Sequence, residues 1–557
     1  MKILLIIPHY GVGMTYQYPH GILFISSYLK HKGYDVMCLN LNHYNSSKLS
    51  EVLKEQSFDI IATGGMFHFI MKYKNIFETA RQYNSNAKII LGGGISSGDP
   101  EFVLNELKPD YLVLGEGEET TDRLLQAIKN GTDPKKVTGI AFMEGDSFIK
   151  TSPTPLIEDL DQIPYPDYEG FEYGYYMDNN KLKNQYLQNL VDPEKRRVGF
   201  LISSRDCVAK CTFCFRIMGG NYRLRSLENL FGEINSLIEK FNINELVLLD
   251  DMFAASKERV YEFCDKIEPM GLKWTCMSRV NMVNEELLKR MKEVGCYWIS
   301  YGFESGSRKV LKSMKKGISP DQMERAIEAT KKSKMAFYGM FIFGDPAETL
   351  ETMYETINFS RKFIGSHMGF RLISPYPGTP LYINLKEKGV LKNLAGFHEN
   401  PYVSINMTSL STTDFLFMEK KIELENYYRK RFSFAKILKL KKISQQIFEL
   451  IISCPHCKEK NNNCLIDFNK GSMIICKYCY QMIFIKLADF RFGNLSQIYQ
   501  HFFFYIKRVV YYNVATHRLL FYVPKIIESM AAKLRHVLNQ FRKALQALQN
   551  LNPAYKN

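Results

Sequence analysis

Three cysteines lie close enough together in the chain to hold a metal centre. Cys207, Cys211 and Cys214 follow the apolar stretch 198–202 at a C-x3-C-x2-C spacing. Four-iron clusters are normally held by four cysteine thiolates, so three thiolates leave one iron open to a substrate or cofactor. The alternatives are scattered buried thiols or half of a zinc site, and the three-residue gap fits zinc spacings poorly. The spacing therefore predicts a [4Fe-4S] cluster with one open iron.

A second group of four cysteines lies near the C-terminus. Cys454 with Cys457 and Cys476 with Cys479 form two C-x2-C pairs separated by eighteen residues. This spacing is typical of a zinc ribbon, in which four thiolates close a structural site. A second iron–sulfur cluster is the alternative. Because seven of the twelve cysteines fall in these two groups, the pattern indicates metal sites in a reducing compartment, and we expect a cytoplasmic protein.

The first 130 residues alternate apolar strand patterns with amphipathic helix patterns. Such alternation predicts an α/β domain with a doubly wound, Rossmann-like parallel sheet, whose ligand binds at the carboxyl ends of the strands. No G-x-G-x-x-G pattern follows the first strand, which argues against a dinucleotide. The residues expected at the strand ends are Gly64, Gly65, Gly92, Gly93, Gly94, Gly115, Glu116 and Gly117.

A second alternating region, from about 197 to 385, predicts six βα units and therefore a partial (β/α)6 barrel of the TIM type. Functional side chains of such barrels gather where the strands end. Asp250, Asp251, Arg279 and Glu304 each follow a predicted strand. They could surround one ligand together with the cysteine loop, or Arg279 and Glu304 could form a structural ion pair across the barrel mouth.

These motifs, in this order, resemble those of the radical S-adenosylmethionine (SAM) enzymes that carry a cobalamin-binding domain before the barrel. The resemblance rests on Phe213 before the last cysteine and on the segments 19–23, 91–94, 114–120, 250–253, 302–306, 344–349 and 374–380. It implies that Cys207, Cys211 and Cys214 bind the cluster and that SAM chelates the open iron. It also implies that Arg279 pairs with the SAM carboxylate, that Glu304 binds its amino group or ribose, and that the stretch around Ile342 packs on adenine. Asp250 and Asp251 stand where many relatives have two glycines and a glutamate.

The resemblance further implies that the glycine-rich strand ends, with Glu116, bind cobalamin. The D-x-H-x-x-G motif that supplies a cobalt ligand in other cobalamin proteins is absent, because His20, His43 and His68 all lack that context. We therefore expect cobalamin to be held without a protein histidine on cobalt.

The function implied is reductive cleavage of SAM to a 5′-deoxyadenosyl radical, used for cobalamin-dependent methylation of an unactivated carbon. Radical cyclisation or rearrangement is the alternative within the same family, and a zinc-ribbon nucleic-acid-binding protein is the alternative from another class. The expected partners are a small-molecule or lipid-like substrate and an electron donor such as flavodoxin or ferredoxin.

Charge is distributed unevenly along the chain. Residues 431–557 hold 20 lysines and arginines against 5 acidic residues, which accounts for the whole net charge of +15. Apolar residues recur at helical spacing between Ile527 and Leu548, beside lysines and arginines. A basic amphipathic helix suits an anionic membrane surface, so we expect a peripheral location, although the stripe could instead pack on the protein's own core. No apolar run is long enough to span a bilayer.

The sequence thus predicts six segments. They are a cobalamin-binding-like domain over 1–140, a proline-rich linker over 141–190, a radical SAM core over 191–400, a helical extension over 401–450, a zinc-ribbon-like module over 451–490 and a basic helical tail over 491–557.

Overall fold

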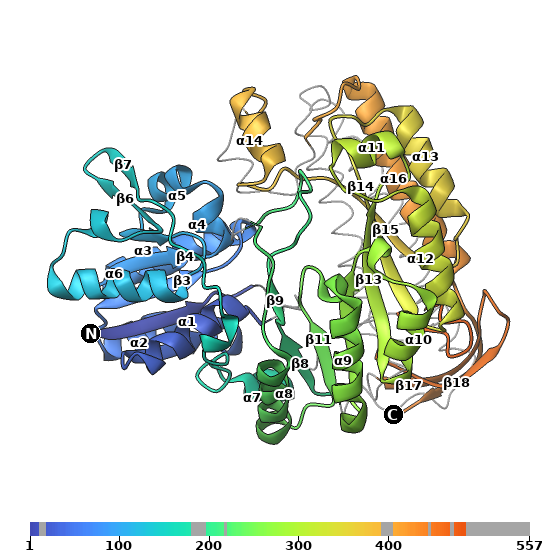
Figure 1. The fold of residues 1–557 in the computed structure, drawn as a ribbon, viewed down its shortest axis with the longest axis horizontal. Coiled ribbons are helices and arrows are strands. Elements are labelled where there is room, and N and C mark those ends of the chain that lie inside the picture. Colours follow the sequence, from blue (N-terminus) through green and yellow to red (C-terminus); the bar gives the residue numbers. More distant parts are fainter. Residues whose placement is uncertain are drawn as a thin grey trace, which may run out of the picture. The chain divides into compact units, whose positions relative to one another are not determined.

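The computed structural model describes residues 1–10, 18–179, 196–216, 220–391, 405–443, 447–467 and 473–485 (Figure 1). The expected tail over 491–557 lies outside the described residues. None of the helices in the described ranges combines the length and the apolar character that a membrane crossing requires.

The N-terminal sheet has the order β2-β1-β3-β4-β5-β6-β7, and its first five strands are parallel. Strand β1 lies between β2 and β3, so the chain changes direction across the sheet at this point, and a ligand crevice is expected there. The strands are β1 (Lys2–Ile7), β2 (Asp35–Asn40), β3 (Ile60–Gly64), β4 (Lys88–Gly92), β5 (Tyr111–Val113), β6 (Ile140–Glu144) and β7 (Ser147–Lys150), and the helices are α1 (His20–His31), α2 (Lys48–Glu55), α3 (Ile70–Tyr83), α4 (Gly94–Gly98), α5 (Pro100–Leu107) and α6 (Glu118–Asn130).

The first domain is longer than the sequence predicted. Strands β6 and β7 pair antiparallel and extend the sheet to Lys150, inside the stretch expected to be linker. Proline density marks the extended part that follows, which ends in the short helix α7 (Tyr173–Asn179). The proline-rich stretch 153–166 therefore lies in the linker, whereas the linker's predicted start at residue 141 falls inside the sheet.

The second sheet has six parallel strands in the order β15-β14-β13-β12-β11-β8, which confirms the partial barrel. Figure 1 shows helices α8 to α10, α12 and α13 running alongside these strands. The strands are β8 (Val198–Leu201), β11 (Glu245–Leu248), β12 (Lys273–Ser278), β13 (Cys296–Glu304), β14 (Ala336–Phe343) and β15 (His367–Leu372), with a short antiparallel pair β9 (Ser204–Arg205) and β10 (Arg223–Leu224); the helices are α8 (Leu227–Phe241), α9 (Lys257–Ile267), α10 (Glu285–Glu293), α11 (Arg308–Ser313), α12 (Pro320–Lys332), α13 (Leu350–Arg361) and α14 (Pro380–Glu387).

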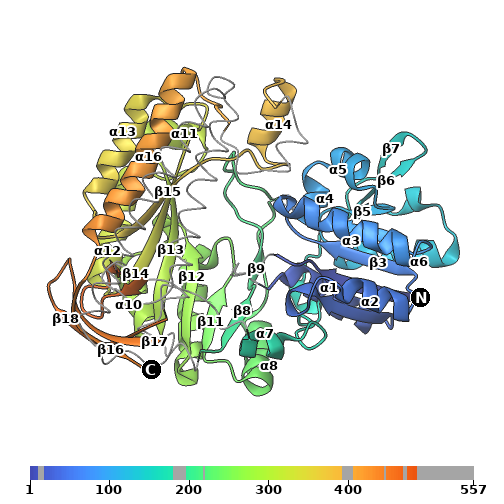
Figure 2. The same cartoon turned by 180° about the vertical axis from the view of Figure 1, so that it is seen from behind.

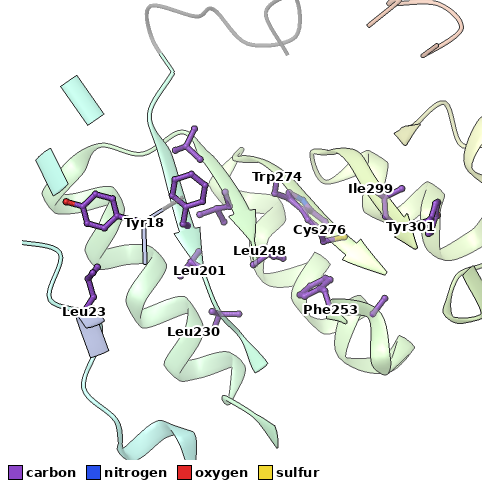
Figure 3. Packing of buried hydrophobic residues seen from close by; sticks show 14 of the residues in the cluster. Tyr18, Leu23, Leu201, Leu230, Leu248, Phe253, Trp274, Cys276, Ile299 and Tyr301 are labelled. Carbon is purple, nitrogen blue, oxygen red and sulfur yellow. The ribbon is translucent and has the colours of Figure 1, made fainter. Parts of the chain in front are cut away.

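Large apolar side chains fill the space between this sheet and its helices. In Figure 3, Leu201, Leu248 and Ile299 come from three different strands, and Leu230 and Phe253 approach them from the helical layer. All five side chains are buried. Burial of this kind contributes about 25 cal/mol per Å² of apolar surface, so the packed sheet is a rigid support for the loops at its ends.

Helix α16 (Thr412–Phe432) covers the open edge of the second sheet, as seen from behind in Figure 2. Asn426 accepts a hydrogen bond from the Phe370 backbone N–H at 3.1 Å and donates to the Phe370 carbonyl at 2.9 Å. An unpaired edge strand is prone to pair with other chains. The Asn426 side chain therefore replaces part of a missing neighbour strand of β15.

The C-terminal module begins earlier than predicted. In the described part of the extension expected to be helical over 401–450, the helix is α16, and strands follow from Lys436 onward. Three antiparallel strands, β16 (Lys436–Lys442), β17 (Ile447–Ser453) and β18 (Lys460–Asp467), lie beside a hairpin of β19 (Met473–Ile475) and β20 (Met482–Phe484). We call residues 436–485 the ribbon module.

Candidate active site

The three predicted cluster cysteines lie in one loop, residues 206–216, which we call the cluster loop. Backbone hydrogen bonds hold this loop from two sides: the Thr212 N–H donates to the Met314 carbonyl and the Thr212 carbonyl accepts from the Leu381 N–H, both at 3.0 Å. All three cysteines are free of disulfides. Three thiols in a loop at the carboxyl ends of the barrel strands fit a cluster with an open iron.

Arg279 and Glu304 are brought to this loop by strands β12 and β13. An Arg279 guanidinium nitrogen, Nη1, lies 3.9 Å from the Cys211 Sγ, and Nη2 donates to the Lys316 carbonyl. The Lys316 Nζ lies 2.7 Å from the Glu304 Oε1 and 5.9 Å from the centre of the Phe213 ring. Glu304 therefore forms its ion pair with Lys316. The alternative, a structural ion pair between Arg279 and Glu304 across the barrel mouth, is wrong.

Lys316 is a site residue that sequence reasoning missed. It lies two positions after Met314, in a run of lysines that reads as a solvated helix end, yet it is only 7% exposed. A buried ammonium paired to a carboxylate beside the cluster loop gives the site both signs of charge, which suits a ligand with amino and carboxylate groups.

The backbone of Glu304 is strained. Its φ is +65°, in the left-handed region, where a residue other than glycine costs on the order of 1–3 kcal/mol. The β13–β14 register also shifts between Gly302 and Glu304. Such strain persists only where the surroundings impose it, and the Glu304 carboxylate at this position lies 2.7 Å from the Lys316 ammonium.

Asp250 has a different environment. It is buried and accepts hydrogen bonds from the Ser203 N–H at 2.9 Å, from the Ser203 hydroxyl at 3.0 Å and from the Ser204 hydroxyl. Burial raises its pKa, although these hydrogen bonds oppose the rise. These contacts fix the chain where β8 leads into the cluster loop. Its role as a direct cofactor contact stays a prediction.

Ile342 and Phe213 lie against the same buried apolar cluster. Both pack beside Ile373, Leu381 and Tyr382, at the end of β14 and the start of α14. This surface is apolar and adjoins the cluster loop, which is compatible with the predicted contact to adenine.

A cavity of about 940 Å³ lies between the strand ends of the first domain and the second sheet. Phe215 and Arg216 of the cluster loop and Asp251 of the barrel line it from one side. From the other side it is lined by the predicted glycines, namely Gly64, Gly65, Gly92, Gly93, Gly94, Gly115 and Gly117. The cavity therefore extends from the glycines that were predicted to bind cobalamin to the cluster loop.

The glycines that line the cavity have two structural roles: some let backbones approach closely, and others leave open space. A Cβ on Gly64 would lie 2.8 Å from the Gly92 carbonyl oxygen, and one on Gly93 would lie 2.7 Å from the Gly65 nitrogen, so these two let the backbones approach. A Cβ on Gly115 would meet no atom within 4 Å, and one on Gly92 only the Val113 Cβ at 4.0 Å. Gly92 and Gly115 therefore leave open space along the cavity wall, as a bulky cofactor requires.

Glu116 is not among the residues that line this cavity. Its carboxylate pairs with Arg205 at 2.7 Å and Arg223 at 2.9 Å and accepts from the Ile157 N–H at 2.7 Å. Burial opposes ionisation of Glu116, but the hydrogen bonds from Arg223 and Arg205 outweigh it and lower its pKa. The side chain predicted to face cobalamin thus joins the first domain to the cluster loop.

Two of the three histidines are held by contacts within the protein. Both ring nitrogens of His20 face backbone carbonyls, Tyr18 at 2.9 Å and Phe200 at 2.8 Å. His43 contacts Glu172 and Asn40. His20 and His68 both line the cavity, and because the His20 ring nitrogens already face these carbonyls, His68 is the histidine to test for a contact with the cofactor.

The four cysteines of the second group also come together. The Sγ atoms of Cys454, Cys457, Cys476 and Cys479 all lie within 4.8 Å of one another, a spacing that fits a single metal ion.

Fold and site together define a protein with a B12-binding domain ahead of a radical SAM barrel. The B12 binding domain family matches residues 14–125, and the radical SAM superfamily matches residues 201–360. A Pyrococcus horikoshii protein named as an uncharacterized methyltransferase is 31% identical over 395 residues, which cover 69% of this chain and 82% of the relative. The chain therefore belongs to the radical SAM enzymes with a B12-binding domain, which decides against the nucleic-acid-binding alternative.

Other relatives carry out different reactions. The anaerobic magnesium-protoporphyrin IX monomethyl ester cyclase of Rubrivivax gelatinosus is 27% identical over 405 residues, covering 70% of each chain. The cytidylyl-2-hydroxyethylphosphonate methyltransferase of Streptomyces wedmorensis is 25% identical over 416 residues, covering 65% of this chain and 77% of the relative.

Solved structures share the fold. The radical SAM methyltransferase TsrM of Kitasatospora setae aligns with a TM-score of 0.59 at 18% identity, over 70% of this chain and 76% of that one. The cobalamin-dependent SAM radical enzyme OxsB aligns with a TM-score of 0.61 at 17% identity, over 78% of this chain and 67% of that one.

Proposed function

We propose that the protein is a cobalamin-dependent radical SAM methyltransferase that methylates an unactivated carbon. The observation that carries this proposal is the cavity of about 940 Å³, which runs from the glycine-rich strand ends to the cluster loop. A methyl donor held by Gly92 and Gly115 would face the same space as a substrate held near Phe215. The most similar relatives described above include two named as methyltransferases.

Different residues of the site would bind the cluster and SAM. Cys207, Cys211 and Cys214 would hold the cluster, and Arg279 and Glu304 would bind the charged end of SAM. When bound, the cluster and SAM supply a carbon radical and cobalamin supplies a methyl group. The Lys316 ammonium lies 2.7 Å from the Glu304 carboxylate, so the carboxylate is oriented before a ligand arrives.

Cyclisation is the second candidate, since the Rubrivivax gelatinosus relative is named as a cyclase. The two reactions differ in what happens to SAM. Methyl transfer from SAM leaves S-adenosylhomocysteine, whereas a reaction that uses SAM only as a radical source leaves 5′-deoxyadenosine and methionine.

The test is incubation of the anaerobically reconstituted, cobalamin-loaded enzyme with SAM and a chemical reductant. Both S-adenosylhomocysteine and 5′-deoxyadenosine are expected, and omission of cobalamin during loading should abolish only the first. Formation of 5′-deoxyadenosine alone, with or without cobalamin, would favour the cyclase.

The same proposal requires a low-potential electron donor, such as a flavodoxin or ferredoxin, for the cluster.

We also propose that the basic segment 491–557 associates with an anionic membrane surface, because its positive charge and apolar stripe occur together. Full-length protein should then float with anionic liposomes, whereas a chain ending near residue 490 should not, and salt should weaken the binding.

A further inference from the structure

The four-cysteine group has the dimensions of a site for one tetrahedral ion. The Sγ atoms of Cys454 and Cys479 lie 3.7 Å apart, as do those of Cys457 and Cys476. A tetrahedron with Zn–S bonds of about 2.3 Å has sulfur–sulfur edges of about 3.8 Å. In a four-iron cluster each thiolate binds a different iron, which sets the sulfur atoms further apart. The geometry therefore fits a single ion rather than a second cluster.

Hydrogen bonds to the sulfur atoms support this arrangement. The backbone N–H of His456 points to the Cys454 Sγ and that of Tyr478 to the Cys476 Sγ, both at 3.4 Å. The Asn461 side-chain amide lies 3.3 Å from the Cys476 Sγ. Donors around a thiolate ligand stabilise its negative charge and fix its direction.

The nearby His456 and Cys464 are not part of the group. The His456 Nε2 lies 3.0 Å from the Met482 carbonyl, so its ring is held by the opposite hairpin. Cys464 is fully buried in β18, and its Sγ lies 3.6 Å from the Asn461 carbonyl. Four thiolates with no open position are typical of structural zinc.

The ribbon module lies against the end of the barrel opposite to the active site. Ile475 packs on Tyr297 and Ala336, at the first residues of β13 and β14, with Tyr480 beside them. The Lys292 ammonium lies 4.5 Å from the centre of the Tyr480 ring. Strand β13 runs from this contact to Glu304, and nine residues of strand span roughly 26 Å.

The first cysteine turn makes a second contact with the barrel. A Cβ on Gly365, between α13 and β15, would lie 2.9 Å from the His456 Nδ1. The ring and the Gly365 backbone are thus in close contact, and His456 lies between two zinc-ligand candidates in the chain. An ion that fixes both cysteine turns therefore also fixes both surfaces that touch the barrel.

We propose that Cys454, Cys457, Cys476 and Cys479 bind one structural zinc ion, which holds the ribbon module against the N-terminal ends of β13 and β14. This site is independent of the methyl-transfer proposal. The ion contacts no substrate, and it stabilises the barrel by keeping Tyr480 and His456 in place.

Metal analysis of the full-length chain tests the ligands. Anaerobically purified protein should contain about one zinc ion per chain beside the cluster iron. Cys457→Ser should lose the zinc and keep the cluster iron, whereas Cys464→Ser, a buried cysteine from the same module, should keep both. Equal loss of zinc in the two variants would overturn the assignment.

A second variant keeps the test independent of the folding of Cys457→Ser. The Cys207→Ala, Cys211→Ala, Cys214→Ala triple variant should lose its iron and retain its zinc. Iron in place of zinc in this variant would mean that the four cysteines hold iron, and the proposal would be wrong.

The contact with the barrel has its own test. Tyr480→Ala should retain zinc but lower the melting temperature, because the packing of its ring at the contact is lost. Tyr478→Ala is the matched control, since Tyr478 lies in the same turn and is 53% exposed. Equal melting temperatures for the two variants would contradict the docking role.

Discussion

Arg205 joins the cluster loop to the first domain through its ion pair with Glu116. Arg205 lies two residues before Cys207, and its guanidinium also pairs with Glu118 at 2.5 Å. The Glu116 and Arg205 side chains are 3% and 10% exposed, so the pair is shielded from solvent. The position of the first cluster cysteine therefore depends on a contact with the B12-binding domain.

Removing the charge of Glu116 tests this dependence. Glu116→Gln should lower the free energy of unfolding by about 2–3 kcal/mol, because two buried guanidinium groups lose a carboxylate that pairs with both of them. It should also reduce the iron retained after reconstitution. Urea unfolding and iron analysis measure the two effects.

The control is Glu119→Gln, three residues further along the same segment. Glu119 pairs with Arg123 on the surface, where its side chain is 39% exposed, and such pairs contribute at most about 1 kcal/mol. If both variants behave alike, the buried pair does not position the cluster loop.

The cluster cysteines give the most direct prediction. The triple Cys→Ala variant at 207, 211 and 214 should hold no four-iron cluster and form no 5′-deoxyadenosine from SAM. Cys264→Ala removes a buried thiol from helix α9, outside the cluster loop, and should retain both properties. Chromatographic detection of 5′-deoxyadenosine under anaerobic conditions distinguishes the two, and product formation by the triple variant would refute the cluster assignment.

The paired charges beside the loop predict a defect in SAM binding. Glu304→Gln should weaken SAM affinity about tenfold, which corresponds to about 1.4 kcal/mol, because the neutral amide binds an ammonium group less strongly. Titration calorimetry on the reconstituted enzyme measures the dissociation constant. Glu355→Gln, an exposed carboxylate on α13, should leave it unchanged, and an unchanged constant in Glu304→Gln would remove Glu304 from the SAM site.

Residues that followed strands were predictable, and residues that depend on long-range pairing were not. The positions of Arg279 and Glu304 near the cluster loop were predictable because every strand of a parallel barrel delivers its last residues to one rim; their contacts with SAM stay a prediction. Lys316 was missed because a lysine run after a helix reads as solvent-exposed, and only the fold shows that Glu304 neutralises it. Glu116 was assigned to the cofactor for its place among glycines, whereas its partners Arg205 and Arg223 lie about 90 and 107 residues away, beyond any local pattern.

Cobalamin binding should not require a histidine on cobalt. His68→Ala should leave the spectrum of bound cobalamin in its base-off form, because no D-x-H-x-x-G motif positions a ligand. Gly115→Leu should instead reduce cobalamin retention, since it fills open space on the cavity wall and strains a backbone with φ of +72°. A spectrum that changes in His68→Ala would identify His68 as a ligand.

Glu348 predicts a pH dependence of stability. It is fully buried after β14 and accepts from the Thr352 hydroxyl at 2.6 Å, and burial raises its pKa from 4.5 to about 7. Between pH 4.5 and 7 the folded chain binds this proton more tightly than the unfolded chain, so this group makes stability fall as pH rises through that window. The loss amounts to on the order of 3 kcal/mol at pH 7.5.

Glu348→Gln should therefore be less sensitive to pH than the wild type between pH 5 and 7.5, with the two curves converging at low pH, where Glu348 is neutral. Glu351→Gln, an exposed carboxylate on the first turn of α13, should follow the wild-type curve. Urea midpoints are measured across this range for all three proteins. The contributions of other titrating groups cancel in the difference between each variant and the wild type. Parallel curves for wild type and Glu348→Gln would show that folding does not raise the pKa of Glu348. A contact other than the one with Thr352 would then stabilise the ionised carboxylate.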